Sequence, residues 1–343
     1  MRIEARRFAI IRNVLGRRIE LICSPTPLHP LPRASADLGI DLWIKRDDLT
    51  GFAGNGNKGR KLEYLLADVL ASGKKKVVTL GSTQSNFVRQ CAAACAMNGI
   101  EFHGVVMDWP YPDEPRKTKP DNWPDATSET GNLLLDRWLG AKVHRLPDGT
   151  FEELESHARK IAESEDAYFI PGGGSCGIGA LGFIAAANEL MMQDPNFDVV
   201  VSASGSGGTQ TGLTYAFARA GHGKRHIGVC TDDEPEMVHD FAAIAAEIDD
   251  IFGDPLRLAA SDFDLRLDYC GRGYGVPTDE ATDAIRYLAR REGIFLDPVY
   301  TGKAFSGVMD MARKGELSGR IVFWHTGGFP GLFATGRQPP ETV

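Results

Sequence analysis

The chain has 343 residues, of which 43% are hydrophobic and 24% charged, a balance typical of globular rather than disordered or fibrous proteins. The formal net charge of −8 argues against a nucleic-acid-binding surface, which would be basic. No apolar run approaches the about 18 residues of a membrane span, and the start, MRIEARRFAI, lacks the apolar stretch of a signal peptide. The six cysteines show no metal-ligand spacing. We therefore predict a cytoplasmic protein without a metal site, and the length favours two domains.

Short apolar runs alternate with amphipathic segments along the chain. Strands are predicted at residues 77–80, 102–107, 142–146, 199–201, 227–230 and 321–324, and helices at 62–70, 85–98, 151–163 and before residue 221. This alternation predicts an α/β fold with parallel sheets and helices on both faces, in which ligands bind beyond the carboxyl ends of the strands. Residues 108–131, which carry five prolines, are predicted to form a long loop: a lid, an interface arm or a solvated surface excursion.

A lysine-rich loop precedes the first predicted helix. Asn57 is the predicted N-cap, so Lys58 stands at the helix start. Because a helix N-terminus disfavours a nearby ammonium, we expect a lowered pKa for Lys58, whose neutral amine is a nucleophile toward a carbonyl. Arg60 and Lys61 lie in the first turn, available to a bound anion. The alternative is that all three are surface charges.

Polar loops follow two of the predicted strands. Gln84, Ser85 and Asn86 offer hydroxyl and amide groups to a carboxylate or a phenolic oxygen, although Ser85 or Asn86 could equally be a helix N-cap. The second loop, residues 204–209 (SGSGGT), opens a helix, where successive backbone N–H groups can bind a phosphate. It matches neither a P-loop nor a dinucleotide fingerprint. The next strand nevertheless ends near Asp232, which keeps a nicotinamide-dependent dehydrogenase open.

Three further sequence patterns give weaker indications of function. Residues 173–177 match the nucleophile elbow G-x-S-x-G and would make a hydrolase with His325; the alternative is a tight turn or an interdomain hinge. Tyr274 and Tyr300 are flanked by Gly or Pro turns and are expected to face a cleft. Cys91 and Cys95 lie four residues apart in an Ala-rich helix and are expected to be core residues rather than a redox pair.

The chain resembles the D-cysteine desulfhydrase and 1-aminocyclopropane-1-carboxylate deaminase family of pyridoxal-phosphate enzymes. The motifs that carry the resemblance fall in order: Asn57-Lys58, Arg60-Lys61-Leu62-Glu63, Gln84-Ser85-Asn86, Gly205 to Thr209, Tyr274-Gly275 and Asp297-Pro298-Val299-Tyr300. The resemblance runs from about Pro25 to Gly328. It implies a two-domain, tryptophan synthase β-like α/β fold (fold type II) with parallel-rich twisted sheets flanked by helices. The large cofactor-binding domain would comprise residues 1–59 and 166–343, with a small domain inserted at 60–165.

The resemblance also implies pyridoxal 5′-phosphate as cofactor, a small amino acid as substrate and a homodimer. Lys58 would hold the cofactor as a Schiff base, and Asn86 would meet the phenolic oxygen of its ring. The phosphate would bind Lys61 and the N–H groups of Gly205, Ser206, Gly207, Gly208 and Thr209. The substrate would meet Gln84, Ser85, Asn86, Tyr274 and Tyr300, of which Ser85 and both tyrosines would act in catalysis beside Lys58.

Two threonines distinguish the branches of this family. Deaminases carry Glu where this chain has Thr301, and Leu where it has Thr326, whereas desulfhydrases carry hydroxyl residues at both places. A carboxylate near the pyridine nitrogen favours its protonation and makes a stronger electron sink, which ring opening requires more than β-elimination does. Thr301 and Thr326 are therefore predicted to contact the cofactor and to favour elimination from D-cysteine, giving pyruvate, ammonia and hydrogen sulfide.

Several alternatives stay open at this point. An L-cysteate sulfo-lyase would use extra donors such as Arg89, Gln84 or the threonine pair for the sulfonate, and Phe87 departs from the polar residue usual in relatives. The aminocyclopropane deaminase and an amino-acid racemase are further alternatives within the family. A catalytically silent ligand-binding protein and the nicotinamide-dependent dehydrogenase are the alternatives outside it.

Overall fold

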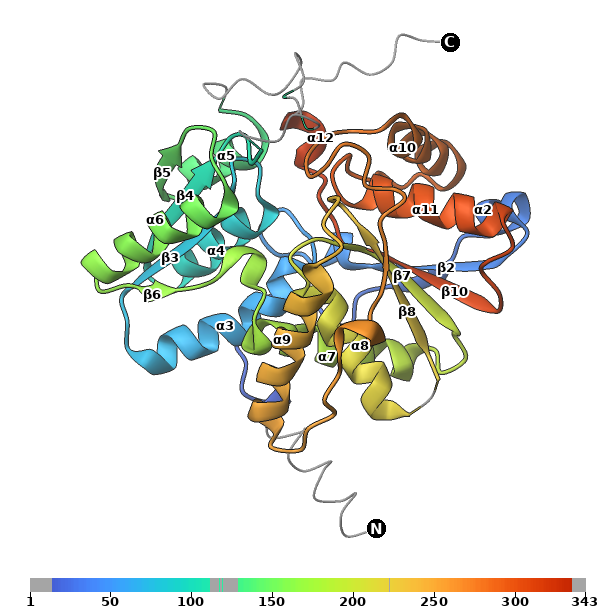
Figure 1. The fold of residues 1–343 in the computed structure, drawn as a ribbon, viewed down its shortest axis with the longest axis horizontal. Coiled ribbons are helices and arrows are strands. Elements are labelled where there is room, and N and C mark those ends of the chain that lie inside the picture. Colours follow the sequence, from blue (N-terminus) through green and yellow to red (C-terminus); the bar gives the residue numbers. More distant parts are fainter. Residues whose placement is uncertain (1–13, 112–116, 118, 120–128, 222, 335–343) are drawn as a thin grey trace.

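Two sheets organise the chain in the computed structural model, which describes residues 14–111, 117, 119, 129–221 and 223–334 (Figure 1). The larger, six-stranded sheet has the order β1-β2-β10-β7-β8-β9, and the smaller, four-stranded sheet has the order β5-β4-β3-β6. Within the described residues, β1 and β2 form the only antiparallel pair. The strands of the larger sheet are β1 (Leu28–Pro30), β2 (Asp41–Arg46), β7 (Val199–Ser204), β8 (Arg225–Cys230), β9 (Asp264–Arg266) and β10 (Arg320–His325).

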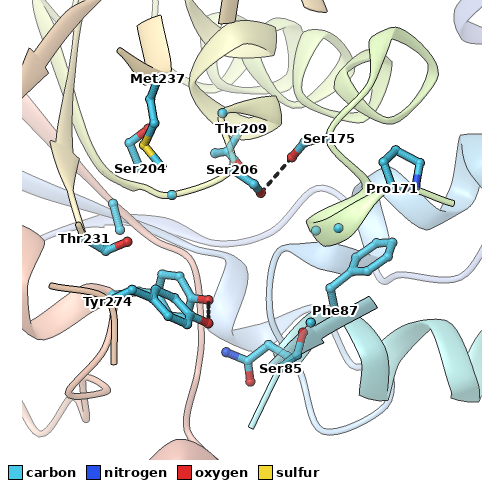
Figure 2. A pocket seen from close by; sticks show the side chains of 18 of the residues that line it. Ser85, Phe87, Pro171, Ser175, Ser204, Ser206, Thr209, Thr231, Met237 and Tyr274 are labelled. Atoms are coloured by element: carbon cyan, nitrogen blue, oxygen red, sulfur yellow. Dashed lines mark hydrogen bonds between the residues drawn. The ribbon is translucent and has the colours of Figure 1, made fainter. Parts of the chain in front are cut away.

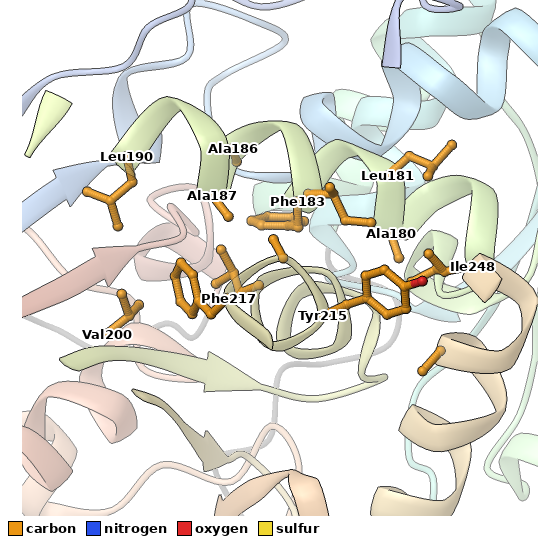
Figure 3. Packing of buried hydrophobic residues seen from close by; sticks show 14 of the residues in the cluster. Ala180, Leu181, Phe183, Ala186, Ala187, Leu190, Val200, Tyr215, Phe217 and Ile248 are labelled. Carbon is orange, nitrogen blue, oxygen red and sulfur yellow. The ribbon is translucent and has the colours of Figure 1, made fainter. Parts of the chain in front are cut away.

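Helices cover both faces of the larger sheet. One face carries α2 (Pro32–Leu38), α10 (Asp279–Glu292) and α11 (Thr301–Arg313), and the other carries α7 (Gly177–Gln193), α8 (Gly208–Ala220) and α9 (Met237–Phe252). Figure 3 shows α7 lying against α8, with Phe183, Tyr215 and Phe217 in the layer between them. The two helices approach closely at Gly212, where a Cβ atom would lie 2.6 Å from Cβ of Phe183. This packing fixes the position of the N-terminus of α8.

The smaller sheet is parallel throughout and lies beside the larger one (Figure 1). It comprises β3 (Lys76–Ser82), β4 (Glu101–Met107), β5 (Lys142–Leu146) and β6 (Tyr168–Phe169). One face packs against α3 (Lys58–Ser72) and α4 (Asn86–Met97), with α5 (Gly131–Trp138) against α4, and the other packs against α6 (Phe151–Ser164). Cys91 and Cys95 lie buried in the first of these cores, as predicted. The short elements are 3-10 helices η1 (Asp47–Leu49), η2 (Gly172–Gly174) and η3 (Ala260–Asp262), and α12 (Gly331–Ala334).

The predicted α/β architecture is confirmed, and each predicted strand is present with limits that differ by at most a few residues. β2 was not predicted from the sequence. Its residues include charged side chains that are typical of a surface segment, yet Lys45 among them is buried in the structure. The domain limits stay a prediction: the smaller sheet includes β6, beyond residue 165, and α3 begins at Lys58, before residue 60. Most of the predicted loop 108–131 lies outside the described residues.

The described part of the chain contains no helix that is long and apolar enough to cross a lipid bilayer.

A buried ion network joins α3 to the larger sheet. The Arg60 guanidinium donates to Asp47 at 2.8 Å from both Nε and Nη2, and to Glu189 at 3.0 and 3.1 Å. The indole of Trp324 donates to the same Asp47 carboxylate at 2.9 Å. Burial alone would raise the pKa of Asp47, but the charge and hydrogen bonds of Arg60 hold it below its ordinary value. Arg60 therefore points into the core and is not available to a bound anion, contrary to the sequence-based expectation.

Replacing Arg60 by Leu leaves Asp47 and Glu189 without their main cationic partner. We expect the free energy of unfolding at pH 7, measured with urea, to fall by about 3–5 kcal/mol. Arg286→Leu, which removes an exposed ion pair with Asp283, should change it by about 0–1 kcal/mol. Because the lowered pKa of Asp47 contributes stability that is present above its ordinary value and is lost at lower pH, the deficit of the Arg60 variant should shrink in acid. If the two variants lost the same free energy of unfolding, the claim that the buried ion network stabilises the fold would be contradicted.

Candidate active site

A cavity of about 510 Å³ lies beyond the carboxyl ends of strands from both sheets. Its walls come from the ends of β3, β7, β8 and β10 and from the first turns of α3, α4 and α8. Figure 2 shows Ser85 and Phe87 on one side, Ser206 and Thr209 on the opposite side, and Tyr274 near Thr231. This is the place where open parallel sheets bind ligands, as the sequence predicts.

Lys58 is the first residue of α3, and it lines the cavity. Burial is the main cause that lowers the pKa of its amine to about 8, while the Asp297 carboxylate opposes this shift. The direction agrees with the sequence-based expectation, although the cause named there was the helix N-terminus. Asn57 occupies the N-cap position, but its side chain does not cap the helix and donates instead to Oγ1 of Thr209 at 3.2 Å. Asn57 thereby joins the starts of α3 and α8 beside Lys58.

Lys61, Ser175, Ser206 and Gly208 form a set that we name the anion site. Nζ of Lys61 donates to Oγ of Ser175 at 3.2 Å and to the carbonyl oxygen of Gly173 at 3.0 Å. The same Oγ accepts the N–H of Gly208 at 3.2 Å and shares a 2.8 Å hydrogen bond with Oγ of Ser206 (Figure 2). Burial and the neighbouring Lys58 ammonium lower the pKa of Lys61 well below its ordinary value. Lys61 has no carboxylate partner among the described residues and lies at a helix N-terminus. A bound phosphate would supply the negative charge that favours its ammonium form, so the site is suited to a phosphate.

Glycines allow the backbone at this helix start to come close to a ligand. Gly207, the N-cap of α8, has φ +87, and a Cβ there would run into the ring of Phe241. A Cβ at Gly208 would lie 2.7 Å from Nζ of Lys61. Gly205, Ser206, Gly207 and Thr209 line the cavity, whereas Gly208 does not and donates its N–H to Ser175. That this loop binds a phosphate stays a prediction.

Ser85 and Asn86 open α4 on the opposite wall. Ser85 is the N-cap, accepting the N–H of Val88 at 3.2 Å, and it also lines the cavity, so its contact with a ligand stays a prediction that capping does not rule out. Oδ1 of Asn86 accepts Nη1 of Arg89 at 3.1 Å and Nδ2 of Asn132 at 3.0 Å. The amide nitrogen of Asn86 is therefore the end left to donate to a ligand.

Gln84 and Arg89 do not reach the cavity. The Gln84 amide bonds the carbonyl oxygen of Thr130 at 3.1 Å and the N–H of Asn132 at 2.9 Å, so it anchors the start of α5. Arg89 is buried and bonds Asn86, Asn132 and the carbonyl oxygen of Asn55. The expectation that Gln84 contacts substrate is thus not met by the geometry, because its amide is used to hold the backbone.

Ser82, Tyr274 and Tyr300 form the tyrosine end of the cavity. The two phenol oxygens lie 2.6 Å apart, and Oγ of Ser82 lies 3.4 Å from that of Tyr274. Burial raises the pKa of both tyrosines, so both hydroxyls carry protons at neutral pH. Both tyrosines face the cavity as predicted, and Ser82 is a cavity residue that the sequence analysis missed.

The two threonines behave differently. Thr326 lines the cavity. Thr301 is fully buried, and its Oγ1 donates to Asp297 at 2.7 Å and accepts the N–H of the same residue at 2.7 Å. The structure therefore does not bring Thr301 to the cavity, because its hydroxyl is used at the start of α11. Of the pair, only Thr326 can offer a hydroxyl to a ring nitrogen.

The hydrolase alternative is contradicted by the geometry. Oγ of Ser175 belongs to the anion site, whereas Nε2 of His325 bonds the carbonyl oxygen of Phe295 at 2.9 Å and His325 does not line the cavity. The sequence analysis did not place Ser175 beside Lys61, because the motif around it indicated a nucleophile elbow, a tight turn or an interdomain hinge. That turn is present as η2, and it is what carries Ser175 to the anion site.

One cluster of potential metal ligands occurs among the described residues, at Glu101, His103 and Glu165. It lies at the start of β4 and the end of α6 and does not line the cavity. Lys142 pairs with Glu101 at 2.7 Å and Lys76 with Glu165 at 2.5 Å, so two ammonium groups already balance these carboxylates.

Comparisons with known proteins agree with this geometry. The family model described as "Pyridoxal-phosphate dependent enzyme" matches residues 19–327. A Pyrococcus horikoshii protein provisionally named 1-aminocyclopropane-1-carboxylate deaminase is 37% identical over 328 residues, covering 93% of this chain and 94% of the relative. The crystal structure of an ACC deaminase homologue superposes with a TM-score of 0.85 at 37% identity, covering 95% of this chain and 97% of the other. A threonine deaminase from Solanum lycopersicum, at 18% identity, shares the fold with a TM-score of 0.67, covering 94% and 84%.

The cavity suits the cofactor of this family. The anion site offers an ammonium and a helix N-terminus to a phosphate, and Lys58 offers a neutral amine to an aldehyde. Oγ of Ser204 and Oγ1 of Thr231 line the cavity and are buried without a hydrogen-bond partner, which a bound polar ligand can supply. The chain belongs to the D-cysteine desulfhydrase and 1-aminocyclopropane-1-carboxylate deaminase family of pyridoxal-phosphate dependent enzymes, and pyridoxal 5′-phosphate is its cofactor.

Proposed function

We propose that this enzyme is a carbon–sulfur lyase that converts D-cysteine and water to pyruvate, ammonia and hydrogen sulfide by α,β-elimination. The observation that carries the proposal is the charge of the cavity wall. Among the described residues, Lys58 and Lys61 are the only cationic side chains that line the cavity, alongside the carboxylates Glu155, Asp232, Glu234 and Asp240. Lys58 would bind the aldehyde of the cofactor and Lys61 its phosphate, so no further cationic side chain of the described lining remains to pair with a sulfonate. A small thiol as leaving group suits this wall better.

We assign the roles of the residues from their positions. The bound cofactor supplies an electron sink for the pair of electrons released when the α-proton leaves. Lys58 binds the cofactor, and its free amine then accepts that proton, which the lowered pKa permits near neutral pH. Lys61, Ser175 and the first turn of α8 hold the phosphate, and the amide nitrogen of Asn86 donates to the ring oxygen.

The remaining cavity residues face the substrate. Ser85 offers its hydroxyl to the substrate carboxylate, and the protonated hydroxyls of Tyr274 and Tyr300 lie where the leaving group can receive a hydrogen bond. Thr326, at the position where deaminases carry Leu, offers a hydroxyl to the ring nitrogen, and such a neutral partner favours elimination over ring opening.

The second candidate is the aminocyclopropane deaminase. The resemblance at 37% identity to a protein provisionally named as such supports it. The two activities share the cofactor but not the first bond that breaks. D-Cysteine loses an α-proton, whereas 1-aminocyclopropane-1-carboxylate has no hydrogen on its α-carbon and must open a ring carbon–carbon bond, so the products separate the two activities.

The identity of the lysine can be tested by reconstitution. We expect apoenzyme to regain the cofactor's absorbance band at a rate that rises with pH and levels off above about 8, because only the neutral amine reacts. Lys58→Ala should show no such band, whereas exposed Lys75→Ala should behave as wild type. A rate still rising at about pH 10, where an ordinary lysine titrates, or a normal band in Lys58→Ala, would refute the assignment.

The anion site predicts a loss of cofactor affinity when the hydroxyl of Ser175 is removed. Ser175→Ala deletes the contacts to Lys61, Ser206 and the N–H of Gly208, and the cofactor Kd, measured by fluorescence titration, should rise about tenfold. Ser164→Ala, at the exposed end of α6, is the matched control and should leave the Kd unchanged. Equal Kd values for the two variants would remove Ser175 from the phosphate site.

The substrate can be identified from its products. Holoenzyme is incubated with D-cysteine, L-cysteine, L-cysteate and 1-aminocyclopropane-1-carboxylate, and sulfide, sulfite, pyruvate and 2-oxobutyrate are measured. We expect sulfide and pyruvate from D-cysteine with the highest kcat/KM, and for L-cysteate a value at least about tenfold lower because its sulfonate lacks a cationic partner. Lys58→Ala gives the uncatalysed background. A higher kcat/KM for 2-oxobutyrate formation would establish the deaminase instead.

A further inference from the structure

Tyr111 does not line the cavity, yet its hydroxyl contacts two residues that do. It follows β4 of the smaller sheet and is 3% exposed. The hydroxyl donates to the Asp232 carboxylate at the end of β8, in the larger sheet, and accepts the backbone N–H of Tyr274 at 2.7 Å. One oxygen atom therefore joins the loop after β4 to the tyrosine end of the cavity.

The contact is directional. A carboxylate only accepts hydrogen bonds, so the Tyr111 hydroxyl donates its hydrogen bond to Asp232. The hydroxyl oxygen then accepts the N–H of Tyr274. Asp232 also accepts Nζ of Lys117 at 3.0 Å and the N–H of Asp233 at 2.9 Å. Lys117 lies 4.1 Å from the centre of the Tyr111 ring, which adds a cation–π contact. Burial and the Asp232 charge raise the pKa of Tyr111, so the proton stays in place.

The backbone at Tyr274 needs such an anchor. Residues 267–278 form neither helix nor strand, and Gly273 and Gly275 on either side of the tyrosine have φ of +125 and +77. Trp109, Tyr111 and Val276 pack together beside the Tyr274 ring, which holds the loop laterally. The hydrogen bond that the N–H of Tyr274 donates to the Tyr111 hydroxyl adds the direction that packing lacks, because it fixes the rotation of the peptide from which the ring of Tyr274 extends.

We propose that Tyr111 is a positioning residue for catalysis: its hydroxyl sets the orientation of Tyr274 against Tyr300 and thereby the binding of the substrate amino acid. The proposal rests on the proposed function insofar as Tyr274 faces the substrate. The anion site is built from α3, η2 and α8, none of which Tyr111 contacts by a hydrogen bond among the described residues. Tyr111 should therefore act on the amino acid and leave the cofactor unaffected.

Tyr111→Phe in the holoenzyme tests this, because it removes the hydroxyl and keeps the ring in its apolar contacts. Two readouts are used: kcat and KM for D-cysteine, and the Kd of D-alanine, which has no leaving group, from the change it causes in the cofactor's absorbance. We expect both the KM and the D-alanine Kd to rise about tenfold, with the cofactor Kd and the thermal midpoint close to wild type. Tyr287→Phe removes another tyrosine–aspartate hydrogen bond, on the surface at Asp37, and should change none of these values.

A double variant tests whether the effect passes through Tyr274. In a Tyr274→Phe background, adding Tyr111→Phe should raise the D-alanine Kd by less than about twofold, because the hydroxyl that Tyr111 orients is already gone. Additive effects, wild-type binding in Tyr111→Phe, or a parallel loss of cofactor affinity would each overturn the proposal. The D-alanine readout needs no turnover, so a wild-type enzyme that binds D-alanine but fails to cleave D-cysteine would reject the proposed substrate without rejecting the role of Tyr111.

Discussion

The buried guanidinium of Arg60 determines the position of α3, and the chemistry of the cavity depends on that helix. Arg60 bonds Asp47 beside the larger sheet and Glu189 on α7, so one side chain ties α3 to both. Gly182 of α7 lets the two helices touch, since a Cβ there would run into the carbonyl of Arg60. A buried charge that is fully hydrogen-bonded tolerates few arrangements, and Lys58 and Lys61 are placed from the same turn.

The cavity contrasts with this balanced network. Lys58 and Lys61 are removed from water, and neither forms an ion pair among the described residues, so burial lowers the pKa of both. The helix N-terminus of α8 and the unpartnered hydroxyls of Ser204 and Thr231 face the same space. Burying these polar groups costs free energy, which the packing of the rest of the fold offsets. A ligand that carries a phosphate and a carbonyl would stabilise the site most, because it supplies partners for both lysines.

The two sheets contribute different halves of the site. The larger sheet contributes the start of α8 to the anion site and Tyr300 to the tyrosine end, whereas the smaller sheet contributes Ser82, Ser85 and Asn86. Tyr111 connects the halves, because it extends from β4 to Asp232 and Tyr274. The amino acid is thus proposed to bind where residues of both sheets meet, and the phosphate where the larger sheet and α3 meet.

The sequence by itself determined the alternation of strands and helices, the parallel sheets and the loops that bear the site, because these follow from local periodicity and turn chemistry. It also indicated Lys58, Asn86 and both tyrosines, which lie beside glycines or helix starts. Only the tertiary structure decided which polar side chains face the cavity. Arg60, Gln84 and Thr301 carry the same kinds of polar group as the residues that line the cavity. Their side chains nevertheless form hydrogen bonds elsewhere, with partners distant in sequence or with neighbouring residues. Ser175 and Tyr111 acquire their contacts from residues 31 to 163 positions away, and no local pattern encodes such separations.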